Sequence, residues 1–376
     1  MVDMNKILDI AIAKGASDIH LIPGNKPMLR VAKSLIPIEE YSELTPDDMT
    51  DIYDYLIKGN LDQDETFKLT RKLDASYEHA GLRFRVNISH SEDVPIATLR
   101  IIKNELPSYE DLGLPDIVRR MTHQPQGLIL VTGKTNSGKT TTLNALINYI
   151  NENQNRKILT LENPIEFKHK SKKSLIVQKE VGKGKDSLTF HEGVKNSLRE
   201  DCDILVIGEI RDRETMEAGI EMAESGHLVL GTLHTKTCAE TIDRMINFYE
   251  VRDQATIKYM LSSLLKMVVS QRLLPNEANY GMTLVPEVMV VDNIIAGIIR
   301  KEKISVSEIE DAIQAGSANG SIGLINSLAE LFVDNKLTLS QAKSQIEERN
   351  LETLNRTIMQ LKIKRQNSSN NNWLGG

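Results

Sequence analysis

GLILVTGKTNSGKTTTLNALINYI, residues 127–150, carries the strongest structural signal in this chain. Its first six residues, Gly127 to Thr132, are an apolar run that predicts a buried strand. They lead into GKTNSGKT at 133–140, which matches the phosphate-loop pattern G-x-x-x-x-G-K-[ST] in full. The residues that follow predict a helix over 141–150. A strand, a glycine-rich loop and a helix in this order predict a nucleotide site on an α/β sheet.

The chemistry of this loop indicates ATP and Mg²⁺ as its ligands. Its glycines let backbone N–H groups converge on phosphate oxygens, and the following helix adds partial positive charge at its N-terminus. Lys139 is expected to reach the β- and γ-phosphates, and the Thr140 hydroxyl to bind Mg²⁺. The predicted nucleotide-binding residues are Gly133, Asn136, Ser137, Gly138, Lys139, Thr140 and Thr141.

A phosphate loop needs an acidic group near Mg²⁺, usually at the end of a neighbouring apolar strand. The run Ile204 to Ile207 predicts such a strand, and Gly208-Glu209 follows it. Glu209 is therefore predicted at the carboxyl edge of the sheet, where α/β proteins bind ligands. We expect Glu209 and Thr140 to hold the metal, with a surface glutamate as the alternative.

Two further apolar runs end in candidate polar residues. Residues 158–161 lead into ENPIE at 162–166, where carboxylates would orient water, although acidic turns are usually only solvated. Residues 228–233 are bracketed by His227 and His234. These two histidines lie seven residues apart without a cysteine or carboxylate at ligand spacing, which argues against a metal site. A γ-phosphate sensor or a strand-coupling role is favoured.

Composition excludes several classes of protein. The chain has 376 residues with a net charge of -6, which suits two or three domains and argues against broad nucleic-acid binding. Cys202 and Cys238 are too few for a disulfide framework or a four-thiolate zinc site. No apolar run reaches about 18 residues, and the N-terminus lacks a signal-peptide pattern, so a cytoplasmic protein without membrane insertion is expected.

The order of patterns along the chain predicts five segments. Alternation at Leu82, Phe84 and Val86 indicates a half-buried strand in the first of them. Thr338 is the expected N-cap of a helix that starts near Leu339 and runs on with an apolar stripe to Leu361. The predicted segments are a small α/β domain at 1–104, a linker at 105–124, an alternating strand–helix core at 125–291, a helical region at 292–365 and a disordered tail at 366–376.

Five boxes together carry a family resemblance. They are GASDIHL at 15–21, the phosphate loop, LENPIE at 161–166, LRED at 198–201 leading to GEIRD at 208–212, and the histidine box at 226–235. In this order they resemble the hexameric secretion ATPases, and within them the PilT-like motors that retract type IV pili, over residues 1 to about 345. The resemblance implies a PAS-like N-terminal α/β domain and a RecA-like P-loop ATPase domain with a helical C-terminal segment.

The resemblance also implies roles for particular residues. Glu166 would be the general base, and Glu209 would support Mg²⁺ and its water. His227 and His234 would couple the nucleotide to neighbouring segments. Three arginines of the N-terminal domain would complete the active site of a neighbouring subunit: Arg83, Arg85 and Arg100.

The activity implied is hydrolysis of ATP to ADP and phosphate by a homohexameric ring that drives pilus retraction and twitching motility. The partners implied are a pilus platform protein of the bacterial inner membrane, at whose inner face the motor would work, and a paralogous motor ATPase. A pilus extension ATPase, a type II or type IV secretion ATPase, and an ATP-binding accessory ring subunit remain alternatives. A nucleic-acid translocase has little support because the chain is acidic and poor in aromatic residues.

Some positions depart from the family pattern. Lys134 and Asn136 stand where the phosphate loop usually has Pro and Gly, and Asn163 stands where Asp is usual. The stretch IIAGIIRK at 294–301 keeps only the frame and Arg300 of the retraction motors' A-I-R-N-L-I-R-E signature. The C-terminal extension resembles that of the accessory retraction subunits. These departures bear on the retraction role more than on ATP hydrolysis.

Overall fold

The computed structural model describes residues 2–31, 34–57, 61–102, 106–276, 281–316 and 318–371, except for the side chains at 61–62 and 367–371. It divides into two compact units. Unit 1 comprises Met1–Leu106, Glu162–His169 and Gln178–Thr189, and unit 2 comprises Pro107–Leu161, Lys170–Val177 and Phe190–Gly376. Two short segments from within the predicted 125–291 core therefore group with the N-terminal residues.

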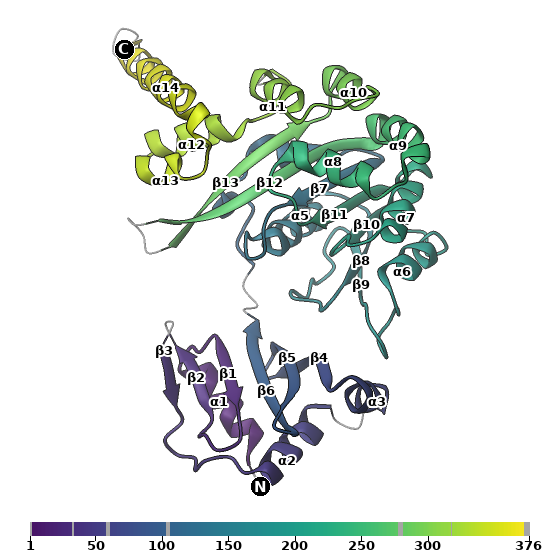
Figure 1. Cartoon of the computed structure of the whole chain (residues 1–376), viewed down its shortest axis with the longest axis vertical. Coiled ribbons are helices and arrows are strands. Elements are labelled where there is room, and N and C mark those ends of the chain that lie inside the picture. The colour runs from purple at the N-terminus through teal and green to yellow at the C-terminus, as the bar shows by residue number, and fades with distance from the viewer. Residues whose placement is uncertain are drawn as a thin grey trace. The chain divides into compact units, whose positions relative to one another are not determined.

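Unit 1 is built on a six-stranded sheet with the order β3-β2-β1-β6-β5-β4, in which all neighbouring strands are antiparallel (Figure 1). Its strands are β1 Asp18–Leu21, β2 Met28–Val31, β3 Ser34–Pro37, β4 Lys72–His79, β5 Leu82–Ser91 and β6 Val94–Ile102, and its helices are α1 Met4–Ala13, α2 Pro46–Ile57 and α3 Leu61–Thr70. The mixture of helices with an antiparallel sheet confirms the predicted small α/β domain.

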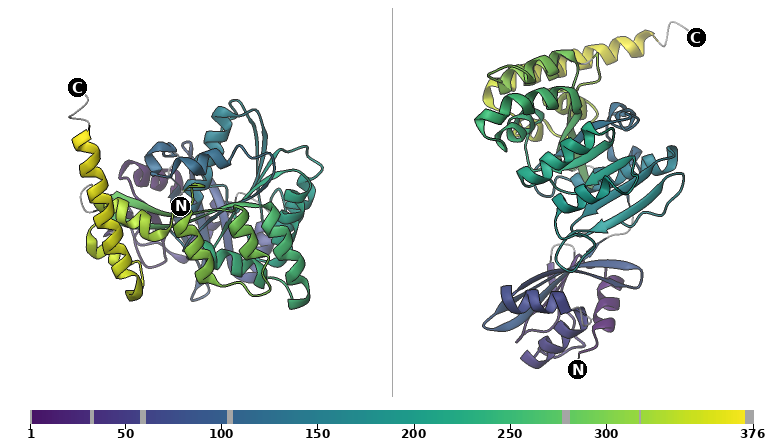
Figure 2. Two further views of the ribbon diagram at one scale, coloured as in Figure 1. Left: turned by 90° about the horizontal axis from the view of Figure 1, so that it is seen from above. Right: turned by 90° about the vertical axis from the view of Figure 1, so that its right-hand side faces the viewer.

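The two faces of this sheet differ sharply in chemistry. On one face, Ile19, Leu29, Phe84 and Leu99 are fully buried in a core shared with residues of the helices. Figure 2 shows the helices of unit 1 on one side of its sheet. The other face is polar because side chains alternate along each strand. There Asp18 lies opposite both Arg30 and Arg100, and Arg100 lies opposite Arg85. The half-buried strand predicted around Phe84 is confirmed as β5.

Unit 2 is built on a seven-stranded sheet with the order β13-β12-β7-β11-β10-β8-β9. The neighbouring pairs among β12, β7, β11, β10 and β8 are parallel, and β13 joins β12 antiparallel. The strands are β7 Gly127–Thr132, β8 Lys157–Glu162, β9 Leu175–Glu180, β10 Ile204–Ile207, β11 Leu228–Leu233, β12 Leu265–Asn276 and β13 Gly281–Val290. The mainly parallel sheet confirms the predicted P-loop ATPase fold.

The central strands of this sheet are buried along their whole length. All residues of β7, β10 and β11 are buried, as continuous apolar runs in parallel sheets require. Helices surround the sheet: α4 Asp116–Met121, α5 Lys139–Asn153, α6 Phe190–Ser197, α7 Arg213–Glu224, α8 Cys238–Asn247 and α9 Val251–Leu264, with the short 3₁₀ helix η1 Glu110–Leu112 before them. The predicted linker thus contains η1 and α4, while 103–105 lie outside the described residues.

The end of the chain is helical, as predicted. It contains α10 Asn293–Ile299, α11 Val306–Ala315, α12 Leu324–Val333, α13 Leu339–Lys343, the 3₁₀ helix η2 Glu348–Asn350 and α14 Leu351–Asn371. Thr338 caps α13 with a complete capping box, which confirms the predicted N-cap. The expectation that this helix runs on to Leu361 is wrong, because α13 stops at Lys343 and a separate α14 begins at Leu351.

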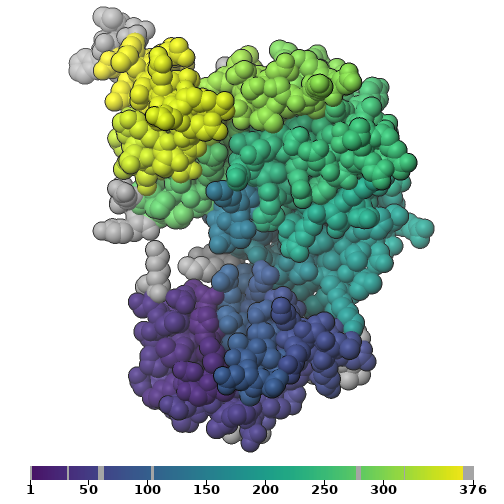
Figure 3. All heavy atoms as spheres, in the orientation of Figure 1, coloured from purple at the N-terminus to yellow at the C-terminus, as the bar shows by residue number. Residues whose placement is uncertain are grey.

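The last helix lies on the surface of unit 2 (Figure 3). Leu354 and Ile358 of α14 are buried in a small core with Leu328 of α12. The backbone of 366–371, in the predicted tail, forms the end of α14, and 372–376 lie outside the described residues. In the part of the chain that the structure describes, no helix has the length and apolarity needed to cross a membrane.

Candidate nucleotide site

The phosphate loop joins β7 to α5, as the sequence predicts. Three of its residues have positive φ: Gly133 at 149°, Asn136 at 64° and Gly138 at 86°. Asparagine enters the left-handed region more readily than most residues other than glycine. The departure from glycine at Asn136 is therefore compatible with a phosphate-binding loop.

Close packing explains the glycines at both ends of the loop. A Cβ atom at Gly133 would lie 2.4 Å from Ser137 Oγ and 2.5 Å from the carbonyl oxygen of Gln271. A Cβ atom at Gly138 would lie 2.7 Å from Leu273 Cδ1. At Gly133 the obstructing Gln271 carbonyl belongs to the backbone, and at Gly138 the φ of 86° strains any residue with a side chain. Both positions therefore favour glycine.

Lys139 lies at the base of the loop and is almost completely buried, with 9% of its surface exposed. Its Nζ donates to the carbonyl oxygens of Gly133 at 2.8 Å and Lys134 at 3.0 Å, and lies 3.5 Å from His234 Nδ1. Burial lowers the pKa of Lys139, and the charge of Glu209 opposes that shift. This buried ammonium group is the cation that the loop offers to phosphates.

Glu209 follows β10 and is held by two side chains. Its Oε2 accepts from Arg211 Nη2 at 2.6 Å, and its Oε1 lies 3.1 Å from His234 Nε2. Burial acts to raise the pKa of Glu209, but the hydrogen bond and charge of Arg211, with the charge of Lys139, lower it overall. The carboxylate is thus kept ionised, as a metal ligand requires.

These contacts form a chain from Lys139 through His234 to Glu209. If Lys139 donates to Nδ1 of His234, the neutral ring must carry its proton on Nε2, which then donates to Glu209. This tautomer is assigned from the bonding pattern. The chain places the loop lysine in electrostatic contact with the carboxylate of the neighbouring strand.

The topology of the sheet explains why these groups meet. In the parallel register, Ile207 of β10 lies beside Gly231 of β11, and Leu233 of β11 lies beside Thr132 of β7. The residues that follow these strands therefore gather at one edge. The backbone is fixed there by Thr232 Oγ1, which donates to the Gly208 carbonyl at 2.6 Å. The predicted meeting of the phosphate loop with Glu209 follows from this geometry.

His227 lies at the opposite edge of the sheet. It precedes β11, and its Nδ1 lies 2.9 Å from Ser225 Oγ and 3.1 Å from the Met222 carbonyl. Six residues of extended strand, roughly 20 Å, separate it from the residues after β11. The structure therefore does not bring His227 together with Lys139 and Glu209, and only His234 of the histidine pair reaches the phosphate loop.

Four predicted site residues lie in unit 1. Glu166 belongs to the segment after β8. Arg83 is buried, and its guanidinium donates to the Ile165 carbonyl at 2.6 Å and to Glu180 at 3.3 Å. Arg85 is exposed. Arg100 is also exposed, but it pairs with a carboxylate on the polar face of the sheet. The three arginines therefore lie in different environments.

That carboxylate is Asp18, which accepts from Arg100 Nε at 2.8 Å. Burial acts to raise the pKa of Asp18, but the hydrogen bonds from Arg100 and Ser17 lower it overall. Next to it on β1, His20 has a buried Nε2 without a partner among the described residues. The sequence GASDIHL thus contributes a charged row to this face.

One wall of the site was not predicted from the sequence. A cavity of about 390 Å³ lies beside the phosphate loop, and its far side is formed by Gln271, Arg272, Ser344 and Gln345. Arg272 Nη1 donates to the Gln345 carbonyl at 2.6 Å, which joins β12 to the segment after α13. These residues lie more than 130 positions after the loop. The only available signal was the polar run Ser270 to Arg272 between the apolar residues at 267–269 and 273–274.

The residues present fit a magnesium nucleotide. Ser137 Oγ and Gln271 Oε1 are buried polar atoms without a partner among the described residues, and both line or adjoin the loop. Thr140 and Glu209 offer the oxygen ligands that Mg²⁺ prefers. No group of three or more His, Cys, Asp or Glu residues in the described chain is arranged to hold a metal ion. A magnesium ion here would take its remaining ligands from phosphates and water.

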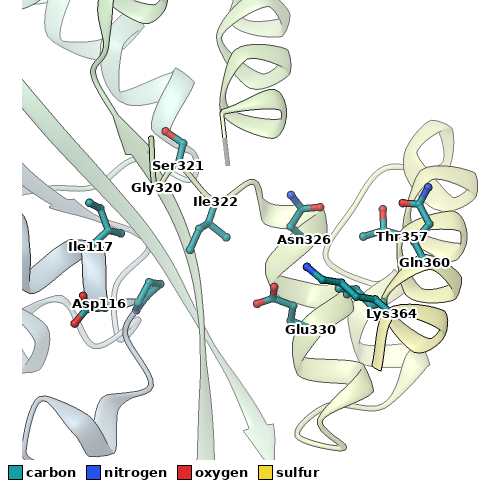
Figure 4. A pocket seen from close by; sticks show the side chains of 12 residues that line it. Asp116, Ile117, Gly320, Ser321, Ile322, Asn326, Glu330, Thr357, Gln360 and Lys364 are labelled. Atoms are coloured by element: carbon teal, nitrogen blue, oxygen red, sulfur yellow. The ribbon is translucent and has the colours of Figure 1, made fainter. Parts of the chain in front are cut away.

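A second cavity in unit 2 is larger but contains none of these groups. It has a volume of about 510 Å³ and lies between α4, the loop at 320–322, α12 and α14. Figure 4 shows Ile117 and Ile322 on one side of it and Glu330 and Lys364 on the other. Size alone therefore does not identify the nucleotide site.

Known proteins resemble the chain over most of its length. The profile of the family described as Type II/IV secretion system protein matches residues 1–280. The type IV pilus retraction ATPase PilT of Pseudomonas aeruginosa is 38% identical over 327 residues, covering 86% of this chain and 91% of that protein. The type IV pilus ATPase PilU of the same organism is 30% identical over 349 residues, covering 93% and 90%.

A solved structure agrees with these sequence matches. The crystal structure of the pilus retraction motor PilT with bound ADP has a TM-score of 0.85 and 34% identity, covering 94% of this chain and 100% of that one. Its ADP indicates that a neighbour with this fold binds an adenine nucleotide. The chain belongs to the type II/IV secretion system protein family, as a PilT-like P-loop ATPase.

Proposed function

We propose that this chain is an ATP-hydrolysing motor that retracts type IV pili. The observation that carries the proposal is the chain of contacts from Lys139 through His234 to Glu209 at the carboxyl edge of a PilT-like sheet. The similarity to PilT, which is named for pilus retraction, supports the direction of the work.

The phosphate loop supplies binding in this proposal. Backbone N–H groups of 133–141 hold the phosphates, and Lys139 exchanges the carbonyls of Gly133 and Lys134 for β- and γ-phosphate oxygens. Thr140 and Glu209 hold Mg²⁺, which when bound supplies charge neutralisation at the phosphates. Because His234 contacts both Lys139 and Glu209, it is placed to transmit the presence of phosphate at the loop to Glu209.

The remaining predicted residues have separate roles in this proposal. Glu166 is the general base that orients the attacking water. The trans role fits Arg85 and Arg100 better than Arg83, because both are exposed whereas Arg83 is buried. Arg100 would first have to release Asp18. His227 acts on the site only through β11, since it lies at the far end of that strand.

The proposal includes an assembly. Six copies form a homohexameric ring by heterologous contacts, and trans arginines require such a neighbour. The ring works at the cytoplasmic face of the bacterial inner membrane on a pilus platform protein, and a paralogous motor ATPase is a further partner. The similarity to PilU supports an accessory retraction subunit as the second candidate, together with the α14 extension.

Deletion of the gene in its own host tests the direction of work. We expect more surface pili by electron microscopy and loss of surface motility, because pilins are no longer pulled out. Cells without surface pili would contradict the retraction role and indicate an extension motor. An unchanged number of pili with lost motility would favour the accessory subunit, and unchanged pili with unchanged motility would indicate another secretion machine.

A further inference from the structure

Gln271 connects the central sheet of unit 2 to the phosphate loop by a hydrogen bond. It lies on β12, is 1% exposed, and its Nε2 donates to the Ser137 carbonyl at 2.7 Å. The amide orientation follows from the partner, because a carbonyl only accepts. β12 pairs with β7 as far as Ser270 beside Thr132, so Gln271 is the first residue of β12 beyond that pairing.

The same residue touches both glycines of the loop. A Cβ atom at Gly133 would lie 2.5 Å from the Gln271 carbonyl oxygen, and one at Gly138 would lie 3.2 Å from Gln271 Nε2. Gln271 therefore packs closely against both glycine positions of the loop. A change in its amide group would shift the backbone atoms that bind phosphate.

The peptide between Ser137 and Gly138 links this contact to phosphate binding. A trans peptide is planar, and its C=O and N–H groups point in opposite directions. A hydrogen bond that holds the Ser137 carbonyl toward Gln271 therefore turns the Gly138 N–H away from it. In a loop of this kind that N–H belongs to the nest that binds phosphate oxygens.

We propose that Gln271 is a positioning residue that orients the Ser137–Gly138 peptide so that its N–H binds phosphate. The inference rests on the proposed nucleotide site. Its Oε1 is buried without a partner among the described residues, so the side chain satisfies only part of its hydrogen-bonding capacity. A residue that served only for packing would not need an amide donor aimed at a carbonyl of the loop.

The test compares Gln271→Met with wild type in full-length protein. Methionine has similar length but cannot donate, so the Ser137 carbonyl loses its partner. We expect the KM for ATP and the competitive inhibition constant of inorganic tripolyphosphate to rise together, by roughly ten- to hundredfold, with a smaller change in kcat. Tripolyphosphate has no base or ribose, so it reports on the loop alone.

Gln154→Met is the matched control. Gln154 is also buried, at 9% exposure, and its Nε2 donates to the Thr122 carbonyl at 3.4 Å, outside the phosphate loop. We expect its KM and inhibition constant to equal those of wild type. A purely structural role for Gln271 would lower kcat through lost active protein and leave KM and the inhibition constant unchanged, which would overturn the proposal.

Gln271→Glu provides a second variant if the methionine variant does not fold. It keeps the volume of glutamine but donates to the Ser137 carbonyl only when protonated. We therefore expect its affinity for tripolyphosphate to be weak at pH 8 and to recover toward the Gln154→Met value as the pH falls to 6. An affinity at pH 8 equal to that of the control would contradict the proposal.

Lys139→Ala separates this inference from the proposed site itself. If Lys139→Ala binds tripolyphosphate as well as wild type does, the nucleotide site is wrongly placed and the inference falls with it. If Lys139→Ala loses binding while Gln271→Met and Gln271→Glu keep it, the site stands and only the positioning role is refuted.

Discussion

Glu287 makes the stability of unit 2 depend on pH. It lies on β13, is 6% exposed, and its carboxylate accepts from the backbone N–H of Cys238 at the first residue of α8. Burial is the main cause that raises the pKa of Glu287 from 4.5 to about 7. The Cys238 hydrogen bond and the charge of Arg272 lower it, and the charges of Glu310 and Glu240 raise it.

The sign of the effect follows from this direction. The folded protein holds the proton more tightly than the unfolded chain, so the stabilising contribution is complete below pH 4.5 and is lost as the pH rises through about 7. Glu287→Gln keeps an oxygen for the Cys238 N–H and does not ionise. We expect the free energy of unfolding of the variant, relative to wild type, to rise by about 2 to 3 kcal/mol between pH 5 and pH 8.

Scanning calorimetry of both proteins at pH 5, 6, 7 and 8 measures this difference. We expect the gain in Tm of Glu287→Gln over wild type to grow by several degrees across the range. Glu224→Gln, at an exposed position, controls for the loss of one negative charge. A difference between Glu287→Gln and wild type that stays constant with pH would refute the reasoning.

Other positions offer sharper local tests. Gly138→Ala puts a methyl group 2.7 Å from Leu273 Cδ1 and strains φ, so the KM for ATP should rise at least tenfold. Gly297→Ala places its methyl group where nothing lies within 4 Å, so the free energy of unfolding in urea should rise by up to about 1 kcal/mol. Thr338→Ala removes the capping box of α13, and urea unfolding should show a loss of about 1 kcal/mol. Arg85→Ala should leave Tm unchanged but lower phosphate release by the assembled ring at least tenfold; unchanged phosphate release would remove its trans role.

Much of unit 2 could be predicted because its strands are apolar runs with marked ends. The runs at 127–132, 204–207 and 228–233 are strands with the predicted bounds. Their parallel arrangement then places the residues that follow them at one edge of the sheet. For this reason Glu209, predicted at this edge from its strand position, and His234, which follows β11, both lie near the phosphate loop.

Long-range packing accounts for what the sequence could not predict. Gln271 and Gln345 line the cavity beside the loop only because β12 and the segment after α13 fold next to it, and no local sequence pattern predicts that arrangement. The same is true of 162–169 and 178–189, whose contacts group them with unit 1. His227 was grouped with His234 because the two bracket one apolar run, but the extended strand between them places only His234 at the edge that holds the phosphate loop.

The most direct test of the central claim is steady-state phosphate release from ATP by purified wild type and Lys139→Ala. The claim is that the buried ammonium group at the base of the loop, linked through His234 to Glu209, makes this sheet edge the site of hydrolysis. We expect wild type to release phosphate and Lys139→Ala to fall to the background of the assay with its Tm preserved. Equal rates for the two proteins would contradict the account, because hydrolysis would then occur without the group on which the site depends.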